Sequence, residues 1–388
     1  MRRGGLWLFV SACLLTGAYF GASRLGFLDR LQARFLPRKL KLSSGDFPAG
    51  VAAPIGGAAV PLRPVRVGFV PRGSSAALLV AAGGAVLSDR PEPEKPLDGV
   101  LRTSFFLDGL AVAYPRDEEL MAALRKGGDE GGVDVAAMTV DRLAEWAAAL
   151  RDAAPRAILL LGRSHGLEAM ASVGPKTLQE LRGKKVAVAR HTACEYFALW
   201  LTARAGLAVD DLQWVEVTTV ADAGKWLREG RVDAAVGFAG DLDLAIRDRG
   251  GTMLASTADA PHLVATVLVT RGEFSARYPD AIRRLVRGLL EAGRLVGKDS
   301  QEGARRLGEV APYLGDPTVA IQLAPPATLD ENLAFFGVHG EPPVTFDELF
   351  TSAGALYLKL GRAPSVPDAE EVRDLAPLRF AASVAPKP

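Results

Sequence analysis

Polar side chains follow several predicted strands of this chain at the points where each strand gives way to a helix. In open parallel sheets, ligands bind beyond the carboxyl ends of the strands, where the following helices present free N–H groups. Such junctions follow the predicted strands 65–70, 133–138, 157–161, 186–189 and 232–238. We expect them to supply the ligand-binding residues Arg72, Ser74, Ser75, Thr139, Asp141, Arg163, Ser164, Arg190, His191, Thr192, Phe238 and Asp241.

The chemistry of these side chains favours recognition of a small, anionic solute. The guanidinium groups of Arg72, Arg163 and Arg190 can pair with a carboxylate, sulfonate or phosphate, and nearby hydroxyls can bond the same ligand. The arginines are equally compatible with solvated surface positions, where their stems cover apolar area. Phe238 is either a core residue or a ring that closes over the ligand.

Several of the candidates also have a local structural interpretation. Ser74, Thr139 and Thr192 are residues typical of helix N-caps, where the hydroxyl bonds a free backbone N–H. Asp141 and Asp241 favour the first turn of a helix through the helix dipole. These positions are therefore compatible with ligand binding and with plain helix initiation.

Catalytic and metal-binding interpretations find little support. Four histidines and two cysteines occur, without the close His or Cys pairs of a metal site, so no metal and no cofactor is predicted. Ser164 and His165 are adjacent, and adjacent residues rarely orient as nucleophile and base. Cys194 at a predicted helix start is either an activated thiolate or a small buried cysteine. We predict no catalytic residue and no enzymatic activity.

The composition limits the class of protein. The chain has 388 residues, with 49% hydrophobic and 23% charged residues, which suits more than one globular lobe. The net charge is +1, which argues against a nucleic-acid-binding protein. Cys13 lies in an apolar N-terminal segment, so a disulfide with Cys194 is not expected.

The elements that position the candidates alternate between strands and helices. The pattern predicts strands at 65–70, 101–107 and 133–138, with helices between them, and then restarts after 161. Alternation of this kind is typical of mostly parallel sheets with helices on both faces. A helix, a glycine and a Val-Asp strand recur within 120–137 and 223–236, which indicates two similar lobes.

The N-terminus predicts contact with a membrane. Residues 4–23 carry no charge and follow Arg2 and Arg3, as in a signal peptide or an uncleaved anchor. The absence of a clear cleavage site favours an anchor or transmembrane helix at 1–23. Residues 24–63 are rich in Gly, Ala and Pro near their end and are predicted to be a tether. Basic residues follow the segment too, so charge counts alone also allow a cytoplasmic body.

Motifs further along the chain resemble one protein family. The run Leu178-Gln179-Glu180-Leu181-Arg182-Gly183-Lys184-Lys185-Val186 is similar to that family's entry to its second lobe. Ala205-Gly206-Leu207, then Gly230-Arg231-Val232-Asp233-Ala234, then Tyr278-Pro279-Asp280 follow in the family's order. From about 65 to 293, the chain resembles the periplasmic substrate-binding proteins of nitrate, sulfonate, taurine and thiamine-precursor ABC transporters.

The resemblance implies a type II periplasmic-binding-protein fold, an α/β fold with a ligand cleft between two parallel or mixed-sheet lobes. Lobe 1 would comprise 64–161 and 256–375, lobe 2 would comprise 162–255, and 376–388 would be a tail. The implied function is capture of a small solute for an ABC permease and its ATPase subunits, on the periplasmic side of the inner membrane. The body would be N-terminally anchored, or secreted if the segment is cleaved.

Departures from the family leave alternatives open. Where one subgroup has Asp-Tyr-Ser-Asn-Gly-Ala-Asp, this chain has Gly162-Arg163-Ser164-His165-Gly166-Leu167-Glu168, so that subgroup's ligand cannot be transferred. An enzyme on the same fold and a membrane-anchored ligand sensor are the competing hypotheses. In the C-terminal region, Asn332 and the run 335–337 either approach the cleft or serve packing.

Overall fold

The computed structural model of the protein describes residues 60–95, 97–312 and 316–385. The predicted membrane segment 1–23 and most of the predicted tether lie outside these residues. Within the described ranges, none of the helices is sufficiently long and apolar to span a bilayer. At the end of the tether, Arg63 is fixed to the body, because its guanidinium donates to Asp134 Oδ2 at 2.7 Å and to Asp129 Oδ1 at 2.8 Å.

Six strands form the first sheet, in the order β2-β3-β1-β4-β11-β5. β1 runs parallel to β3 and β4, whereas β11 is antiparallel to both β4 and β5. β3, β4 and β11 are mostly apolar and are buried along their whole length, as expected of strands that are covered on both faces. The strands are β1 (Val65–Phe69), β2 (Ala85–Leu87), β3 (Gly109–Ala113), β4 (Val135–Thr139), β5 (Arg156–Arg163) and β11 (Ala265–Thr270).

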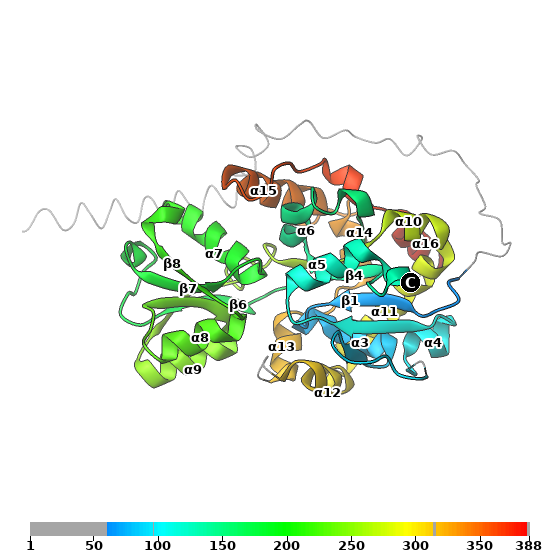
Figure 1. The fold of residues 1–388 in the computed structure, drawn as a ribbon, viewed down its shortest axis with the longest axis horizontal. Helices are drawn as coiled ribbons and strands as arrows, with labels where there is room; N and C mark the ends of the chain where they lie inside the picture. The colour runs from blue at the N-terminus through cyan, green and yellow to red at the C-terminus, as the bar shows by residue number, and fades with distance from the viewer. Residues whose placement is uncertain (1–59, 96, 313–315, 386–388) are drawn as a thin grey trace, which may run out of the picture. The chain divides into compact units, whose positions relative to one another are not determined.

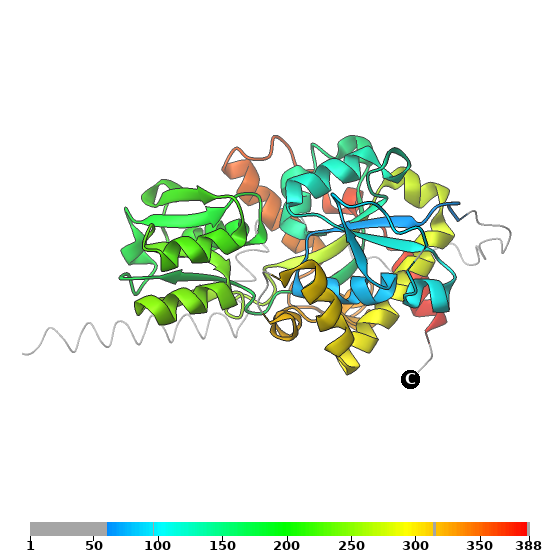
Figure 2. The same cartoon turned by 60° about the horizontal axis from the view of Figure 1, so that its bottom comes forward.

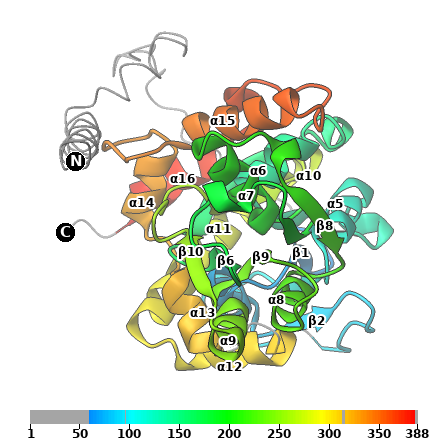
Figure 3. The ribbon, with the colours of Figure 1, turned by 90° about the vertical axis from the view of Figure 1, so that its left-hand side faces the viewer.

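Helices cover both faces of this sheet and, with it, make up what we call the first lobe. α3, α4 and α11 pack together on one side of β1, while α6 and α15 pack together on the other (Figure 1; Figure 3 shows the second pair). α11 is amphipathic: Ile282, Leu285, Val286 and Leu289 recur at helical spacing and are buried. The helices are α3 (Ala76–Ala82), α4 (Val100–Phe105), α5 (Asp117–Lys126), α6 (Val140–Trp146), α10 (Gly272–Arg277), α11 (Pro279–Lys298), α12 (Gln301–Val310), α13 (Pro317–Leu323), α14 (Leu329–Phe335), α15 (Phe346–Lys359) and α16 (Ala376–Val384).

Five further strands form a second sheet, in the order β10-β6-β9-β7-β8. β6 is antiparallel to β10 and β9, whereas β7 is parallel to β8 and β9. α7 lies on one face of the sheet and α8 and α9 on the other, which gives three layers (Figures 1 and 2). We call this sheet and its helices the second lobe: β6 (Glu168–Ser172), β7 (Lys185–Ala189), β8 (Gln213–Val217), β9 (Ala234–Phe238), β10 (Thr252–Ser256), α7 (Ala193–Arg204), α8 (Val220–Arg228) and α9 (Ala239–Arg249).

Two connections pass between the lobes and lie side by side. One joins β5 to β6 and the other joins β10 to β11. They are hydrogen-bonded to each other: Ser164 N donates to Val264 O at 2.9 Å, and Thr257 N donates to Glu168 O at 2.9 Å. Paired crossovers of this kind are the natural hinge of a two-lobed protein.

The predicted strand at 101–107 is wrong, because residues 100–105 form helix α4. Thr103 Oγ1 donates back to Gly99 O at 2.9 Å, and Leu101 is buried beside Gly288 of α11. Packing against α11 therefore outweighs the β-propensity of the aromatic and branched residues. The strand lies later, at β3. Strand β6 had no counterpart among the predicted strands.

Residues 376–384, predicted as part of a tail, form helix α16. Leu378 and Ala381 are buried, and the helix packs on α11. Pro377 in its first turn fits the helix start, where no N–H is needed.

Candidate functional site

Pairs of oppositely charged side chains join the two lobes where strand ends meet helix starts. Several of these side chains belong to a buried group that we call the interlobe site: Arg72, Asp117, Asp141, Arg142, Glu145, Glu168 and Glu195. The pairs that cross between the lobes are Arg72–Glu168 (Nη1 to Oε1, 3.9 Å), His191–Glu145 (Nδ1 to Oε1, 3.2 Å) and Arg362–Glu195 (Nη1 to Oε1, 2.7 Å).

Arg72 enters the site from the end of β1. Its backbone N donates to Ser75 Oγ at 3.1 Å, which shapes the turn Gly73–Ser75. Its guanidinium Nη2 donates to Asp117 Oδ2 at 3.0 Å, and both side chains are buried. Arg72, predicted to meet an anionic ligand, is thus held by a carboxylate of the protein, the first residue of α5.

Arg142 occupies the centre of the first turn of α6. Its Nε donates to Asp141 Oδ2 at 2.8 Å and its Nη1 to Glu145. The guanidinium also lies 5.7 Å from the ring centroid of Trp146 and 5.0 Å from that of Tyr357, distances at which a cation is attracted to an aromatic face. The helix therefore carries a buried, internally paired charge group.

Glu168 is the first residue of β6 and lies at the crossovers. Its Oε2 accepts a hydrogen bond from Ser164 Oγ, whose hydroxyl also lies 3.0 Å from Thr257 Oγ1. Gly166 N donates to the same threonine oxygen at 2.8 Å. The hinge thereby holds one oxygen of Glu168 in place and leaves the other toward Arg72.

The start of α7 contributes the predicted residues Arg190, His191 and Thr192. Thr192 caps the helix by accepting a hydrogen bond from Glu195 N at 3.3 Å. Glu195 Oε1 is contacted by Arg190 Nε at 3.0 Å and by Arg362 Nη1 at 2.7 Å. His191 has a φ of 56°, uncommon for a residue other than glycine, and its N donates to Glu195 Oε2 at 2.8 Å.

Some polar atoms of this region are buried without a hydrogen-bond partner among the described residues. They are Thr139 Oγ1, Asp141 Oδ1, Arg142 Nη2, Glu168 Oε1, the Tyr357 hydroxyl and Arg362 Nη1. Thr139 occupies the N-cap position of α6, yet its hydroxyl does not cap the helix. Buried polar groups are nearly always satisfied in folded proteins, so this concentration of unsatisfied atoms makes the region the candidate site for a ligand.

Two other predicted residues turn away from the interlobe site. Ser74 Oγ donates to Thr266 Oγ1 at 3.2 Å within the first lobe, and the residue that precedes α3 as its N-cap is Ser75. Arg163 stacks over Phe335, with its guanidinium carbon 4.7 Å from the ring centroid. Burial lowers the pKa of Arg163.

Phe238 and Asp241 begin α9 in the second lobe. Phe238 is buried and stands directly opposite Glu168 in the β6–β9 register. Asp241 lies against Gly224 of α8, and its burial raises its pKa to about 6.

The adjacent residues Ser164 and His165 do not contact each other as a catalytic pair would. Ser164 contacts Glu168, and His165 is exposed.

Sequence reasoning missed most of the acidic half of the site. For Glu195 a signal exists, since Thr192-Ala-Cys-Glu195 has capping-box spacing. Asp117 could be identified only as an acidic residue in a first helical turn. Glu145 and Glu168 carry no local signal, because their burial depends on the opposite lobe.

Burial changes the protonation chemistry of the site. It raises the pKa of Asp117, which Arg72 only partly offsets, and it raises the pKa of Glu168. Burial also raises the pKa of the Cys194 thiol well above its usual range, with a further contribution from Glu168. Cys194 is thus a buried thiol, and the thiolate interpretation is disfavoured.

Replacing His191 with asparagine should weaken the contact between the lobes in a pH-dependent way. The hydrogen bond to Glu145 raises the pKa of His191. For Glu145, burial acts to raise the pKa, but the hydrogen bond from His191 and the charge of Arg142 outweigh burial, so the pKa of Glu145 is lowered. The pair therefore stabilises the fold below the ordinary histidine pKa and loses that contribution as pH rises through the raised value. We expect a loss of about 0.5–1 kcal/mol near pH 5.5, limited by solvent screening, and almost none near pH 8.5.

Urea unfolding of both proteins at the two pH values measures this difference. Asparagine tolerates positive φ, so the backbone at this position is kept. An equal loss at both pH values would show that the charge of His191 is not involved.

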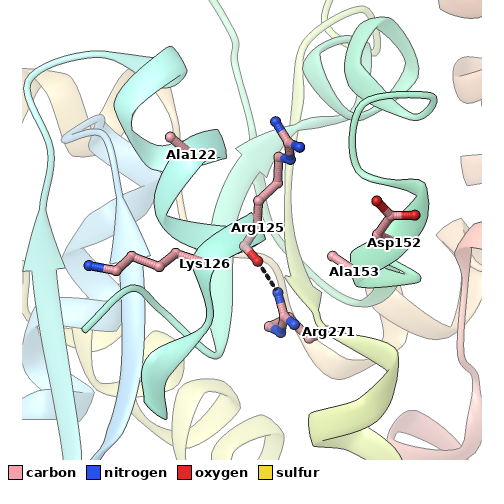
Figure 4. A pocket seen from close by; sticks show the side chains of 6 residues that line it. All are labelled: Ala122, Arg125, Lys126, Asp152, Ala153 and Arg271. Atoms are coloured by element: carbon pink, nitrogen blue, oxygen red, sulfur yellow. Dashed lines mark hydrogen bonds between the residues drawn. The ribbon is translucent and has the colours of Figure 1, made fainter. Parts of the chain in front are cut away.

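Two cavities lie in the first lobe, apart from the interlobe site. One, of about 340 Å³, is lined by Arg125, Lys126, Asp152 and Arg271, with Ala122 and Ala153 (Figure 4). Arg271 Nη1 donates to Arg125 O at 2.6 Å, so its charge is already anchored to the end of α5. The other, of about 420 Å³, lies between α10, α11 and α16.

The C-terminal residues with open roles serve packing. Asn332 Oδ1 accepts from Leu160 N at 2.7 Å and its Nδ2 donates to Leu160 O at 3.0 Å, which ties α14 to β5. Phe335 and Phe336 are buried against each other and against Phe346.

Comparison with protein families confirms the resemblance. Residues 163–302 match the family described as NMT1/THI5 like. A search of curated proteins found no match.

Solved structures show the same two-lobed fold. The periplasmic aliphatic sulphonate-binding protein SsuA from Escherichia coli is 16% identical, with a TM-score of 0.60 over 80% of this chain and 91% of that one. The periplasmic nitrate-binding protein NrtA from Synechocystis PCC 6803 is 12% identical, with a TM-score of 0.55 over 82% and 88%. The desulfurization enzyme DSZB is also similar, at 12% identity and a TM-score of 0.54 over 82% and 99%. At these identities the likeness concerns the fold, which hosts both binding proteins and an enzyme.

Proposed function

We propose that this chain, NMT1/THI5-like over residues 163–302, is the solute-binding component of an ABC-type importer. The observation that carries the proposal is the set of unsatisfied, buried polar atoms where the lobes meet. Thr139 Oγ1, Asp141 Oδ1 and Glu168 Oε1 come from both lobes, so one small molecule between the lobes could satisfy all of them. The similar structures of sulfonate- and nitrate-binding proteins support this function.

The mechanism follows from the crossovers and the interlobe contacts. Rotation about the connections at Ser164 and Thr257 would separate Arg72 from Glu168 and His191 from Glu145, opening a path for the solute. A bound solute adds contacts that exist only when the lobes are together, and therefore shifts the population toward the closed form. The closed, ligand-bound conformation is the form that a permease would recognise.

Binding without chemical conversion is favoured over an enzymatic role. A nucleophile needs a base within hydrogen-bond reach or a lowered pKa. Ser164 Oγ lies within reach of Glu168, but the hydroxyl is buried at the crossovers between Glu168 and Thr257, and the pKa of Cys194 is raised rather than lowered. We therefore propose a binding protein. Because the enzyme DSZB shares this fold, any ligand recovered from the protein should be analysed for chemical conversion.

Further parts of the proposal concern the setting of the protein. Its partners would be a permease and an ATPase, with no role for nucleic acid. Residues 1–23 would anchor the body on the periplasmic side of the inner membrane. The lobes would divide at 162 and 256, so that 64–161 and 256–375 move against 162–255.

Thermal unfolding of the full-length protein with a broad set of solutes tests the function. A ligand present at about a thousand times its Kd stabilises the fold by about 4 kcal/mol, a shift of several degrees. Thr139→Val should leave the free protein equally or more stable, because it removes an unsatisfied hydroxyl, and should reduce the ligand-induced shift. Thr218→Val, at an exposed position, is the control. If no solute stabilises the protein, the binding function is wrong.

A further inference from the structure

The interlobe site contains more buried carboxylates than arginines able to neutralise them. Asp117 is paired with Arg72 at 3.0 Å, and Asp141 with Arg142 at 2.8 Å. Glu168 is fully buried, yet the cation paired with it among the described residues is Arg72, 3.9 Å away and already bonded to Asp117. One negative charge in this region is therefore left without a close counterion.

Further carboxylates surround the same region but have partners of their own. Glu195 is paired with Arg190 and Arg362, and Glu145 with Arg142 and His191. The cationic side chains at the rim of the site are therefore already paired with carboxylates of the protein. An incoming anion would therefore meet guanidinium groups that are already occupied.

Three of the unsatisfied atoms in this region can accept hydrogen bonds. Glu168 Oε1 and Asp141 Oδ1 are carboxylate oxygens, and Thr139 Oγ1 can accept as well. Burial raises the pKa of Glu168, and the Asp141 carboxylate contributes to the same shift. A buried, unpartnered carboxylate oxygen is costly, and a ligand that supplies N–H donors with positive charge removes that cost. Unsatisfied donors lie in the same region, namely Arg142 Nη2, Arg362 Nη1 and the Tyr357 hydroxyl, and they leave room for a hydroxyl or carbonyl on the same ligand.

Phe238 offers a suitable surface beside Glu168. The two residues are directly opposite in the antiparallel β6–β9 register, and directly opposite residues project from the same face of a sheet. Phe238 is buried. A carboxylate with an aromatic ring beside it is an arrangement that favours ammonium and guanidinium groups.

A metal ion is a poorer fit than an organic cation. Across the described ranges, no group of three or more His, Cys, Asp or Glu side chains is arranged to hold a metal. The carboxylates are instead paired one at a time with Arg72 and Arg142, so they do not form the shell of several oxygens that a divalent ion requires.

We propose that the solute bound between the lobes is a small organic cation that carries N–H donors, an ammonium or guanidinium compound, with Glu168 as its counterion. This inference rests on the proposed solute-binding function and replaces the anionic solute expected from the sequence. Asp141 and Thr139 would accept further hydrogen bonds from the same group. Phe238 would contact its apolar part.

The test compares charge classes on the full-length protein by thermal shift, followed by titration calorimetry of the solutes that bind. The probes are amines and guanidines (ethanolamine, putrescine, agmatine), anions (isethionate, nitrate, phosphate), a neutral compound (urea) and the ions Mg²⁺ and Zn²⁺. We expect an amine or guanidine to stabilise the protein and the anions to have no effect. Stabilisation by an anion or a metal ion alone would overturn the proposal of a cationic solute but not the proposed solute-binding function. If no probe stabilises the protein, both proposals are wrong.

The variant Glu168→Gln tests whether Glu168 is the counterion of the bound cation. The amide keeps the shape and removes a buried, poorly compensated charge, so the free variant should unfold at the same temperature as wild type or higher. Its affinity for the amine should fall by about tenfold or more. Glu216→Gln, at an exposed position of the same lobe, is the matched control and should bind as wild type does. Equal binding by Glu168→Gln and wild type would show that Glu168 is not the counterion.

Discussion

Replacing Arg72 with methionine is expected to lower the free energy of unfolding of the ligand-free protein by about 3–5 kcal/mol. The methionine fills much of the same volume, so the loss comes from the charge rather than from a cavity. It leaves Asp117 without its partner at 3.0 Å, and Glu168 without the cation paired with it among the described residues, both inside the protein. Uncompensated buried carboxylates must either be protonated or attract water into the site.

Denaturant unfolding with a double-mutant cycle separates this effect from general damage. Asp117→Asn should reduce the loss caused by Arg72→Met, because one of the stranded charges is then absent. Arg116→Met is the matched control: Arg116 is exposed and pairs with Glu119 on the surface, so its loss should cost less than about 1 kcal/mol. If Arg72→Met and Arg116→Met cost the same, Arg72 is solvated and the buried network does not exist as described.

Replacing Phe346 with alanine is expected to cost about 3–5 kcal/mol of stability. Phe346 is fully buried at the start of α15, and its ring centroid lies 5.3 Å from that of Phe336, 5.7 Å from that of Phe350 and 6.0 Å from that of Phe335. Removal of the ring loses its transfer free energy and leaves a cavity among rings that cannot all move into it.

The same experiment tests whether the C-terminal segment is part of the core of the first lobe. Leu358→Ala, on the exposed side of the same helix, should change stability by less than about 1 kcal/mol. A small effect of Phe346→Ala would mean that α14 and α15 are peripheral. In that case Arg362, which follows α15 and contacts Glu195, would be a poor interlobe anchor.

Most of the core elements were predictable because they are strong local patterns. Apolar runs bounded by glycine or a cap predict strands such as β4 and β9, and helical spacing predicts α11. The run 101–107 was misassigned because its residues favour a strand locally, while Leu101 gains more by packing as part of a helix on α11. β6 was missed because its residues, Glu168 to Ser172, include no β-branched or aromatic side chain and become a strand through pairing with β9 and β10.

The sequence predicted the backbone positions of several candidate residues, but it did not predict which charged groups surround their side chains. Strand-to-helix junctions indicate where Arg72, Thr139 and Thr192 lie, since those positions follow from local turns and caps. What each side chain faces depends on residues far away in the chain, such as Asp117 for Arg72.

By itself, the sequence determined most of the strands and helices, a family resemblance over about 65–293, of which residues 163–302 match the family model, and the loops that carry polar side chains. These are properties of short segments, set by hydrophobic periodicity, turns and caps. Only the tertiary structure decided that Arg72 and Arg190 are paired with carboxylates of the protein and that Glu168 lacks a close counterion among the described residues. The reason is that an electrostatic environment is a sum over neighbours in space, and folding brings those neighbours from distant parts of the chain.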